Sequence, residues 1–289
     1  MRILGVGIAT LDIINRVTSY PSEDAEVRAL DQQQVRGGNV TNTLVVLSQL
    51  GHDCHWAGSL ADEPDSQAIL DDLARYQIDT GHCMVHAGGK VPTSYVTLSA
   101  ATGSRTIIHH RDLPEYPAEV FAFIDLNEYD WVHFEGRNVA DLRVMLQRTR
   151  NAGLPCSLEV EKPREGIETL FDLPDLLLFS RVYARHAGYS RPDAFLAEVP
   201  PAGREAYCAW GELGAWVRDS AGDIGHAPAV HVPEVVDTLG AGDVFNAAVI
   251  DARVRELDPQ QAMAAGCRLA GRKCGQHGLA GLCDDSVPL

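Results

Sequence analysis

The second half of the chain alternates short apolar runs with segments of helical periodicity, from about residue 118 onward. Strands are expected at 129–134, 155–160, 176–180 and 205–209, with helices at 139–151 and 181–187 between them. Such alternation is typical of βαβ units, in which helices connect parallel strands. Polar residues and glycines gather where these strands end, and in open α/β sheets that edge binds ligands. The sequence therefore predicts an α/β fold with its site at the carboxyl ends of the strands.

The first third of the chain has a different pattern. An apolar strand is expected at 2–8, a helix at 40–50, a strand at 52–60 and a helix at 64–76. Half-exposed strands at 11–17 and 27–35, and again at 92–99 and 105–109, predict two hairpins outside the main sheet. With lid strands inserted at about 11–34 and 91–111, they would build a small β-sheet lid. Its edge strands need covering, which predicts a homodimer through the lid.

Composition limits the possible functions. The 289 residues contain no repeat or linker, which predicts one domain over 1–289. A formal net charge of −16 argues against nucleic-acid binding, and no apolar run is long enough for a membrane span. Seven cysteines without a CxxC pair indicate buried thiols in a reducing compartment, hence a cytoplasmic location. The apolar N-terminus is interpreted as a first strand rather than a signal peptide.

The glycine-rich stretch at 237–246 reads Asp-Thr-Leu-Gly-Ala-Gly-Asp-Val-Phe-Asn. It predicts a strand that ends at Val236, a tight turn, and then a helix. Gly240, Ala241 and Gly242 would leave the first amides of that helix accessible, and these amides lack intrahelical acceptors. Together with the helix dipole they would form an anion hole for a phosphate.

Asp243 falls in the first turn of the same predicted helix. There it can take the proton of a hydroxyl that attacks the bound phosphate. An aspartate is a weak base, but a loose phosphoryl-transfer transition state needs only late proton removal. The alternative is a simple helix cap, a common role for aspartate near a helix N-terminus.

Residues 36–42, Arg-Gly-Gly-Asn-Val-Thr-Asn, precede another predicted helix. Asn39 and Asn42 are three positions apart, so they project from the same side of its first turn. Amide side chains donate and accept hydrogen bonds, which suits a polyol. Alternatively, Asn39 is only an N-cap. Asp12 and Asp24, in and after the first lid strand, either face the same pocket or are solvated loop acids.

Several further candidates lie near predicted strand ends. Arg137 can clamp a phosphoryl group or a sugar oxygen, or else it pairs with Glu135 or Glu161. Glu161 can help to hold Mg²⁺ through water, or it is a structural acid. Gly211 and Gly214 either let nucleotide phosphates approach the backbone or form a tight turn without a ligand. Arg105, at the start of a lid strand, either reaches a nucleotide phosphate or is solvated.

These motifs together resemble the ribokinase-type (PfkB) carbohydrate kinases, with most similarity to the ketohexokinase branch. The similar stretches are Leu-Asp-Ile-Ile at 11–14, Tyr-Pro-Ser-Glu-Asp at 20–24, Arg-Gly-Gly-Asn at 36–39, Glu-Gly-Arg-Asn at 135–138, Glu-Val-Glu-Lys-Pro-Arg-Glu at 159–165, Cys-Ala-Trp at 208–210, the glycine-rich stretch at 236–243 and Gly-Arg-Lys-Cys-Gly at 271–275. The resemblance implies a ribokinase-like three-layer α/β/α fold with a lid. It also implies ATP-dependent phosphorylation of a ketohexose, such as fructose at its 1-hydroxyl.

By the same resemblance, each candidate residue acquires an expected role. Asp243 would be the base, and Gly240, Ala241, Gly242 and Arg137 would assist catalysis. Sugar contacts would come from Asp12, Asp24, Gly38, Asn39, Asn42, Arg137 and Asp243. Nucleotide contacts would come from Arg105, Trp210, Gly211, Gly214, Gly240, Gly242 and Cys274. The implied cofactors are ATP and Mg²⁺, with Glu161 as a metal ligand, and a monovalent cation such as K⁺ near the Asp237–Thr238 backbone is a further family feature.

One departure concerns the metal. Many members of the family carry Asn-x-x-Glu after the strand that ends at Ser180, whereas this chain reads Arg-Val-Tyr-Ala-Arg at 181–185. The metal arrangement therefore does not carry over there. The alternatives to a fructose kinase are a kinase for another sugar, sugar derivative or nucleoside, and a catalytically silent relative that only binds sugar or nucleotide.

Overall fold

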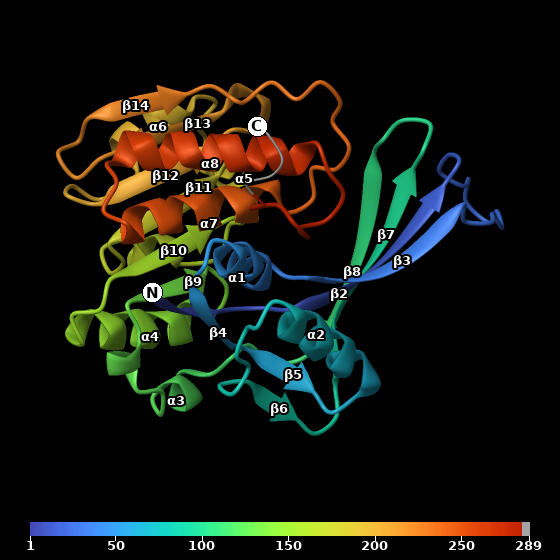
Figure 1. Cartoon of the computed structure of the whole chain (residues 1–289), viewed down its shortest axis with the longest axis horizontal. Coiled ribbons are helices and arrows are strands. Elements are labelled where there is room, and N and C mark those ends of the chain that lie inside the picture. Colours follow the sequence, from blue (N-terminus) through green and yellow to red (C-terminus); the bar gives the residue numbers. More distant parts are fainter. Residues whose placement is uncertain (285–289) are drawn as a thin grey trace.

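An eight-stranded, mostly parallel sheet forms the centre of the molecule in the computed structural model, which describes residues 1–284 (Figure 1). In sheet order the strands are β14 (Ile224–Ala227), β13 (Ala215–Arg218), β12 (Glu205–Ala209), β11 (Leu176–Ser180), β10 (Cys156–Val160), β9 (Trp131–Glu135), β1 (Arg2–Val6) and β4 (Asp53–Ala57). The six strands from β12 to β4 pair in parallel, and β13 and β14 add an antiparallel edge. The predicted parallel sheet is confirmed.

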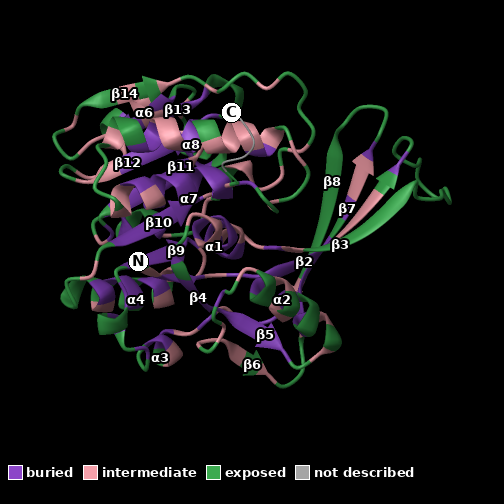
Figure 2. Ribbon diagram, viewed as in Figure 1, coloured by how far each residue is buried: buried purple, intermediate pink, exposed green. Residues whose placement is uncertain are grey.

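Helices cover both faces of this sheet. They are α1 (Asn39–Gln49), α2 (Pro64–Arg75), α3 (Ala118–Phe121), α4 (Val139–Asn151), α5 (Arg181–His186), α6 (Pro192–Glu198), α7 (Ala241–Val254) and α8 (Pro259–Cys274), with short 3₁₀ turns at Leu126–Glu128, Ile167–Leu170 and Gly211–Leu213. Buried side chains of α1, α7 and α8 pack in one core cluster, and those of α4, α5 and α6 in another. Figure 2 shows this buried interior between the helical layers. The three-layer α/β/α architecture is thus confirmed.

A four-stranded sheet projects from one end of the molecule and forms the lid (Figure 1). Its order is β3 (Asp31–Gly37), β2 (Thr10–Val17), β7 (Lys90–Ser99) and β8 (Arg105–Asp112), with β2 and β7 parallel in the middle. Both edge strands, β3 and β8, are mostly exposed (Figure 2). A separate two-stranded sheet pairs β5 (Ser59–Ala61) with β6 (Met84–His86). No helix among residues 1–284 is long and apolar enough to cross a membrane.

Three expected strands differ from the structure. The second lid strand begins at Asp31 rather than at residue 27, because pairing with β2 starts only there. The strand expected at 52–60 is interrupted at Gly58, where a Cβ atom would lie 2.3 Å from the Trp56 ring, and the chain moves there from one sheet to another. In the described part of the chain, the last strand is β14, so no strand ends at Val236. Its N–H donates instead to the carbonyl of Cys274, at the end of α8.

Candidate active site

A cavity of about 1620 Å³ lies between the lid and the carboxyl ends of the parallel strands. The cavity is lined by residues at or just beyond the ends of several neighbouring strands, namely Ile8, Glu135, Glu161, Ser180 and Ala209. The lid contributes β2, β3, β7 and β8, and the glycine-rich stretch before α7 closes another side. The cavity therefore opens at the predicted edge of the sheet.

The glycine-rich stretch forms the expected turn and helix start. Gly240 has a φ of +79°, a conformation that favours glycine, and it is the N-cap of α7 without a side-chain hydrogen bond. Gly240, Gly242 and Asp243 all line the cavity. The first amides of α7 thus start at the cavity wall, where the helix dipole favours an anion.

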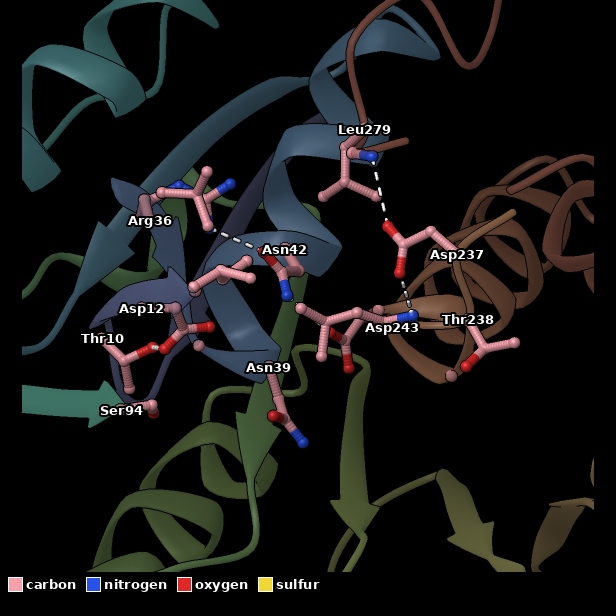
Figure 3. Close-up of a pocket in the computed structure, with 18 of the residues that line it drawn as sticks. Thr10, Asp12, Arg36, Asn39, Asn42, Ser94, Asp237, Thr238, Asp243 and Leu279 are labelled. Carbon is pink, nitrogen blue, oxygen red and sulfur yellow. Dashed lines mark hydrogen bonds between the residues drawn. The ribbon is translucent and has the colours of Figure 1, made fainter. Parts of the chain in front are cut away.

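Asp243 lies in the first turn of α7 with its side chain in the cavity wall and only 7% exposed. Its Oδ2 accepts a hydrogen bond of 2.7 Å from Nδ2 of Asn42 on α1. Figure 3 shows Asp243 facing Asn42, Asn39 and Asp12 across the same space. Gly240 is the N-cap of α7, and within the described residues no side chain forms a capping hydrogen bond there. Asp243 is therefore not a helix cap, and its carboxylate remains available within the cavity.

Burial and neighbouring negative charges raise the pKa values of Asp243 and Glu159. Burial raises the pKa of Asp243 well above its usual value, and the charges of Glu161 and Glu135 add to the rise, against the Asn42 hydrogen bond. Burial also raises the pKa of Glu159, where the nearby charge of Asp243 is the next cause. Asp243 is therefore a stronger base than an ordinary aspartate, whereas the sequence indicated a weak one.

The predicted sugar side of the cavity comes together from β2 and α1. Asp12 is buried and accepts a hydrogen bond from Thr10 Oγ1 at 2.9 Å. Gly38 has a φ of +108°, and a Cβ atom there would lie 2.3 Å from the Ile8 carbonyl. Gly38 is also the N-cap of α1, which excludes the alternative that Asn39 is only an N-cap. Asn39 instead donates to Glu159 and Glu161.

A hydrogen-bond chain that the sequence did not reveal fixes the amide of Asn42. Arg36 Nε pairs with Asp72 at 2.8 Å, and Arg36 Nη1 donates to Asn42 Oδ1 at 2.8 Å. With its oxygen occupied, the Asn42 amide presents its Nδ2 to Asp243. The signal was present, because Arg36 opens the same motif, but nothing in its spacing to residue 72 predicts the contact.

Arg137 lines the cavity but does not point freely into it. Its Nε donates to Glu115 at 2.9 Å and its Nη1 to Glu135 at 3.3 Å, so one of the two ion pairs considered from the sequence forms. Arg111 of β8 also pairs with Glu115. Glu135 in turn accepts the Ile8 N–H at 2.9 Å. Arg137 is thus held at the end of β9, beside the cavity.

Two charged candidates connect the lid and the strand ends with the rest of the site. Arg105 Nη1 lies 3.3 Å from Thr238 Oγ1, so a residue of β8 reaches the stretch that leads into α7. Glu161 Oε2 accepts from Asn39 at 3.1 Å and lies 3.4 Å from Lys162 Nζ. Both line the cavity.

Six candidates lie outside the cavity lining: Asp24, Trp210, Gly211, Gly214, Ala241 and Cys274. Asp24 is exposed in the turn between β2 and β3, with a φ of +64°. Gly214 has a structural explanation, because a Cβ atom there would lie 2.1 Å from the Ala227 carbonyl. Trp210 is buried beneath Arg185, which stacks 5.8 Å from its ring centre. Cys274 contributes its carbonyl to Val236 and Asp237.

The site provides partial support for a divalent cation. Within residues 1–284, no cluster of three or more histidine, cysteine or acidic side chains is arranged to hold a metal. However, in the part of the chain that the structure describes, Glu159 Oε2 is buried without a hydrogen-bond partner, close to the charges of Glu161 and Asp243. Mg²⁺ needs few carboxylates, keeps several waters and binds substrate phosphates. The acidic oxygens therefore suit a cation that arrives with a nucleotide. Glu159 was not identified from the sequence.

Comparisons with known proteins agree with this geometry. The model of the pfkB family of carbohydrate kinases matches residues 2–285. The chain is 38% identical to ketohexokinase of Mus musculus over 293 aligned positions, which cover 97% of this chain and 98% of that protein. In fold it is similar to a putative ribokinase from Agrobacterium tumefaciens, with a TM-score of 0.85, 23% identity, and coverage of 96% and 92%. It is also similar to Arabidopsis thaliana ribokinase complexed with ribose and ATP, with a TM-score of 0.74, 16% identity, and coverage of 96% and 93%.

The family model spans nearly the whole chain, and mouse ketohexokinase is 38% identical over the same length. Both findings agree with the predicted fold and with the resemblance of the motifs. The chain belongs to the pfkB family of carbohydrate kinases.

Proposed function

We propose that this protein transfers the γ-phosphoryl group of ATP to a hydroxyl of a ketohexose, fructose-like and at the 1-position, with Asp243 as the base. The observation that carries the proposal is the position of Asp243. It is a buried carboxylate of raised pKa at the start of α7, beside the amides that can hold a phosphate. The identity of 38% to mouse ketohexokinase supports the ketohexose.

In the proposed reaction, the sugar lies against Asp12, Asn39 and Asn42 below the lid. Asp243 accepts the proton of the attacking hydroxyl as the oxygen–phosphorus bond forms and the bond to the ADP oxygen breaks. The first amides of α7, at Ala241 and Gly242, stabilise the charge on the transferred group. Arg137 orients that group or a sugar oxygen from the end of β9.

ATP and Mg²⁺ are the proposed cofactors. When bound, Mg²⁺ neutralises phosphate charge, and Glu159 and Glu161 are the acidic side chains that can hold it through water. Arg105 is proposed to contact a nucleotide phosphate from the lid. The proposed contacts of Trp210, Gly211, Gly214 and Cys274 require a nucleotide that extends beyond the cavity described above. A resident K⁺ near Asp237 is considered below.

A panel of sugars tests the proposal. Purified protein is incubated with ATP, Mg²⁺ and single sugars, and ADP release is followed together with the ³¹P NMR spectrum of the product. We expect fructose to give the highest kcat/KM and a 1-phosphate. A higher kcat/KM for an aldose, a sugar phosphate or a nucleoside would replace the ketohexose. Stabilisation by sugar without ADP formation across the panel would identify a silent binder instead.

A homodimer through the lid is also proposed, because β3 and β8 leave exposed strand edges and Ile107 and Ile108 are exposed large apolar side chains. Asp24 is not in the cavity of its own chain, so a sugar contact from it requires a second copy or a moved lid. Light scattering at working concentration decides, since a monomeric mass would reject the dimer.

A cytoplasmic location is proposed on the thiol chemistry, with Cys54, Cys156 and Cys208 buried.

A further inference from the structure

A fully buried lysine lies directly behind the glycine-rich stretch. Lys273 is in the last turn of α8 and has no exposed surface. A buried ammonium is costly unless its donors are all satisfied by oxygen atoms. Its Nζ donates to the backbone oxygen of Asp237 at 3.0 Å, to Asp237 Oδ2 at 2.8 Å and to the backbone oxygen of Gln276 at 3.3 Å. Three donors thus meet three acceptors.

The oxygen atoms around Lys273 belong to two segments that line the cavity. Asp237 begins the stretch 237–240, and Gln276 precedes the stretch 277–280, and both stretches contribute to the cavity wall. Asp237 Oδ1 also accepts the Leu239 N–H at 2.9 Å, and its Oδ2 accepts the Gly278 N–H at 3.3 Å. Figure 3 shows Asp237 between Thr238 and Leu279. One positive charge therefore joins both segments next to Gly240.

The same oxygen atoms are the ones that a monovalent cation near the Asp237–Thr238 backbone would need. A carboxylate and backbone carbonyls are typical ligands of a hard cation. Here the ammonium already fills that position with the same charge, so a separate ion does not fit without displacing Lys273. The negative end of the α8 dipole also favours a cation at this place.

We propose that Lys273 is a built-in substitute for a monovalent cation: its ammonium positions the 237–240 stretch, and hence the N-terminal amides of α7, so that phosphoryl transfer is independent of K⁺. Lys273 is a positioning residue, because it contacts the loop rather than the substrate. The proposal rests on the proposed kinase function where it concerns catalysis. Its prediction about cation binding stands apart from that function.

The first test uses the unmodified protein. Turnover and the thermal midpoint are compared in KCl, NaCl and choline chloride at equal ionic strength. We expect both quantities to be the same in KCl and in choline chloride. A rise of turnover in KCl by about tenfold or more over choline chloride would overturn the proposal, because a loop that positions donors for the transferred group would then depend on the ion. If no sugar yields ADP, the proposed function fails, and the thermal comparison still decides about the cation.

The second test removes the ammonium. Lys273→Met keeps an unbranched side chain that is one atom shorter and leaves Asp237 without its cation. We expect kcat to fall by at least about tenfold in choline chloride, and KCl or NH₄Cl to restore much of it and to raise the thermal midpoint. The control is Lys90→Met, which removes a half-buried ammonium paired with Glu63 and Asp65 outside the cavity. It should show no response specific to K⁺.

A purely structural role for Lys273 would give a different result. The Lys273→Met protein would then be less stable in every salt, with no difference between KCl and choline chloride in midpoint or kcat, and the proposal would be rejected. If that variant does not fold, Lys273→Gln supplies the neutral side chain. The comparison of salts on the unmodified protein decides without any variant.

Discussion

Asp237 and Asp243 lie six positions apart at the same loop–helix junction, yet their surroundings are opposite. Asp237 is held by Lys273 and by the N–H groups of Leu239 and Gly278. Burial opposes its ionisation, but these hydrogen bonds keep the pKa of Asp237 below its usual value. Asp243 accepts a hydrogen bond from Asn42, and burial together with nearby carboxylates raises its pKa.

The contrast shows how one short motif provides both stability and reactivity. A carboxylate whose two oxygens both accept hydrogen bonds from fixed donors is a poor base, because those donors stabilise its charged form. Asp237 therefore serves to fix the loop. Within residues 1–284, Asn42 donates to Asp243 at Oδ2, and the charge environment of Asp243 is unfavourable, so taking up a proton relieves it. The two aspartates should respond in opposite ways to the loss of their charge.

The largest expected effect is on turnover. Replacing Asp243 with Asn removes the base, and we expect kcat to fall about 10²–10⁴-fold, with sugar binding kept. ADP release and calorimetric titration with the sugar measure the two quantities. The control is Asp193→Asn, which neutralises an aspartate in the first turn of α6 that pairs with Arg191 on the surface. Turnover like that of the control would reject Asp243 as the base.

The next effect is on stability, at the other aspartate. Asp237→Asn leaves Lys273 buried without its counterion, so the free energy of unfolding should fall by about 3 kcal/mol. Urea unfolding measures it. The loss should shrink at acid pH. The pKa of Asp237 is lower in the folded than in the unfolded protein, so its charge stabilises the fold fully at pH values above the unfolded pKa, and this stabilisation disappears as the pH falls through the folded pKa. An unchanged midpoint would show that the pair contributes nothing.

A smaller effect is expected from the partner of Asp243. Asn42→Leu removes the donor of the 2.7 Å hydrogen bond and leaves Arg36 without one acceptor. A hydrogen bond to a charged group suggests a loss in kcat/KM of roughly 10–100-fold. Steady-state kinetics measures it, with Gln67→Leu, on the exposed face of α2, as the control. A loss confined to stability would mean that Asn42 only packs there.

The smallest expected effect is a gain in stability, whereas most substitutions lower the free energy of unfolding. Because the raised pKa of Asp243 means that its charge destabilises the unliganded fold, Asp243→Asn should raise the free energy of unfolding by about 1 kcal/mol at neutral pH. A carboxyl of raised pKa stabilises the fold only when protonated, so the gain should grow as pH rises through that pKa and vanish in acid. Thermal unfolding between pH 5 and pH 8 measures it. A variant less stable than the unmodified protein at pH 8 would contradict the charge argument.

The sequence predicted the parallel sheet well, because runs such as Leu176–Ser180 are apolar and bounded by clear helix signals. A local helix signal of the same kind starts α8, where Asp258 and Gln261 form a capping box. Predictions failed where tertiary context decides. The exposed residues 27–30 continue an alternating pattern, but the ladder with β2 starts at Asp31, with Leu30 donating its N–H to the Arg16 carbonyl just before it. The stretch before Asp237 pairs with the end of α8 instead of forming a strand.

Within the site, local motifs predicted several of the residues that line the cavity, including Asp12, Asn39, Asn42 and Asp243. Contacts between distant segments could not be read in the same way. The pairing of Arg36 with Asp72, of Arg137 with Glu115 and of Lys273 with Asp237 joins positions whose spacing follows no local period. The raised pKa of Asp243 likewise depends on Glu161 and Glu135, which only the folded sheet brings near.

The most direct measurement compares Asp243→Asn and Asp237→Asn in one assay, at a temperature where both are folded, with saturating ATP, Mg²⁺ and the preferred sugar. We predict that the first variant loses turnover while its thermal midpoint is kept or raised. The second should lose midpoint and retain far more turnover than the first. Equal turnover in the two variants, or full turnover in Asp243→Asn, would contradict the assignment of Asp243 as the base.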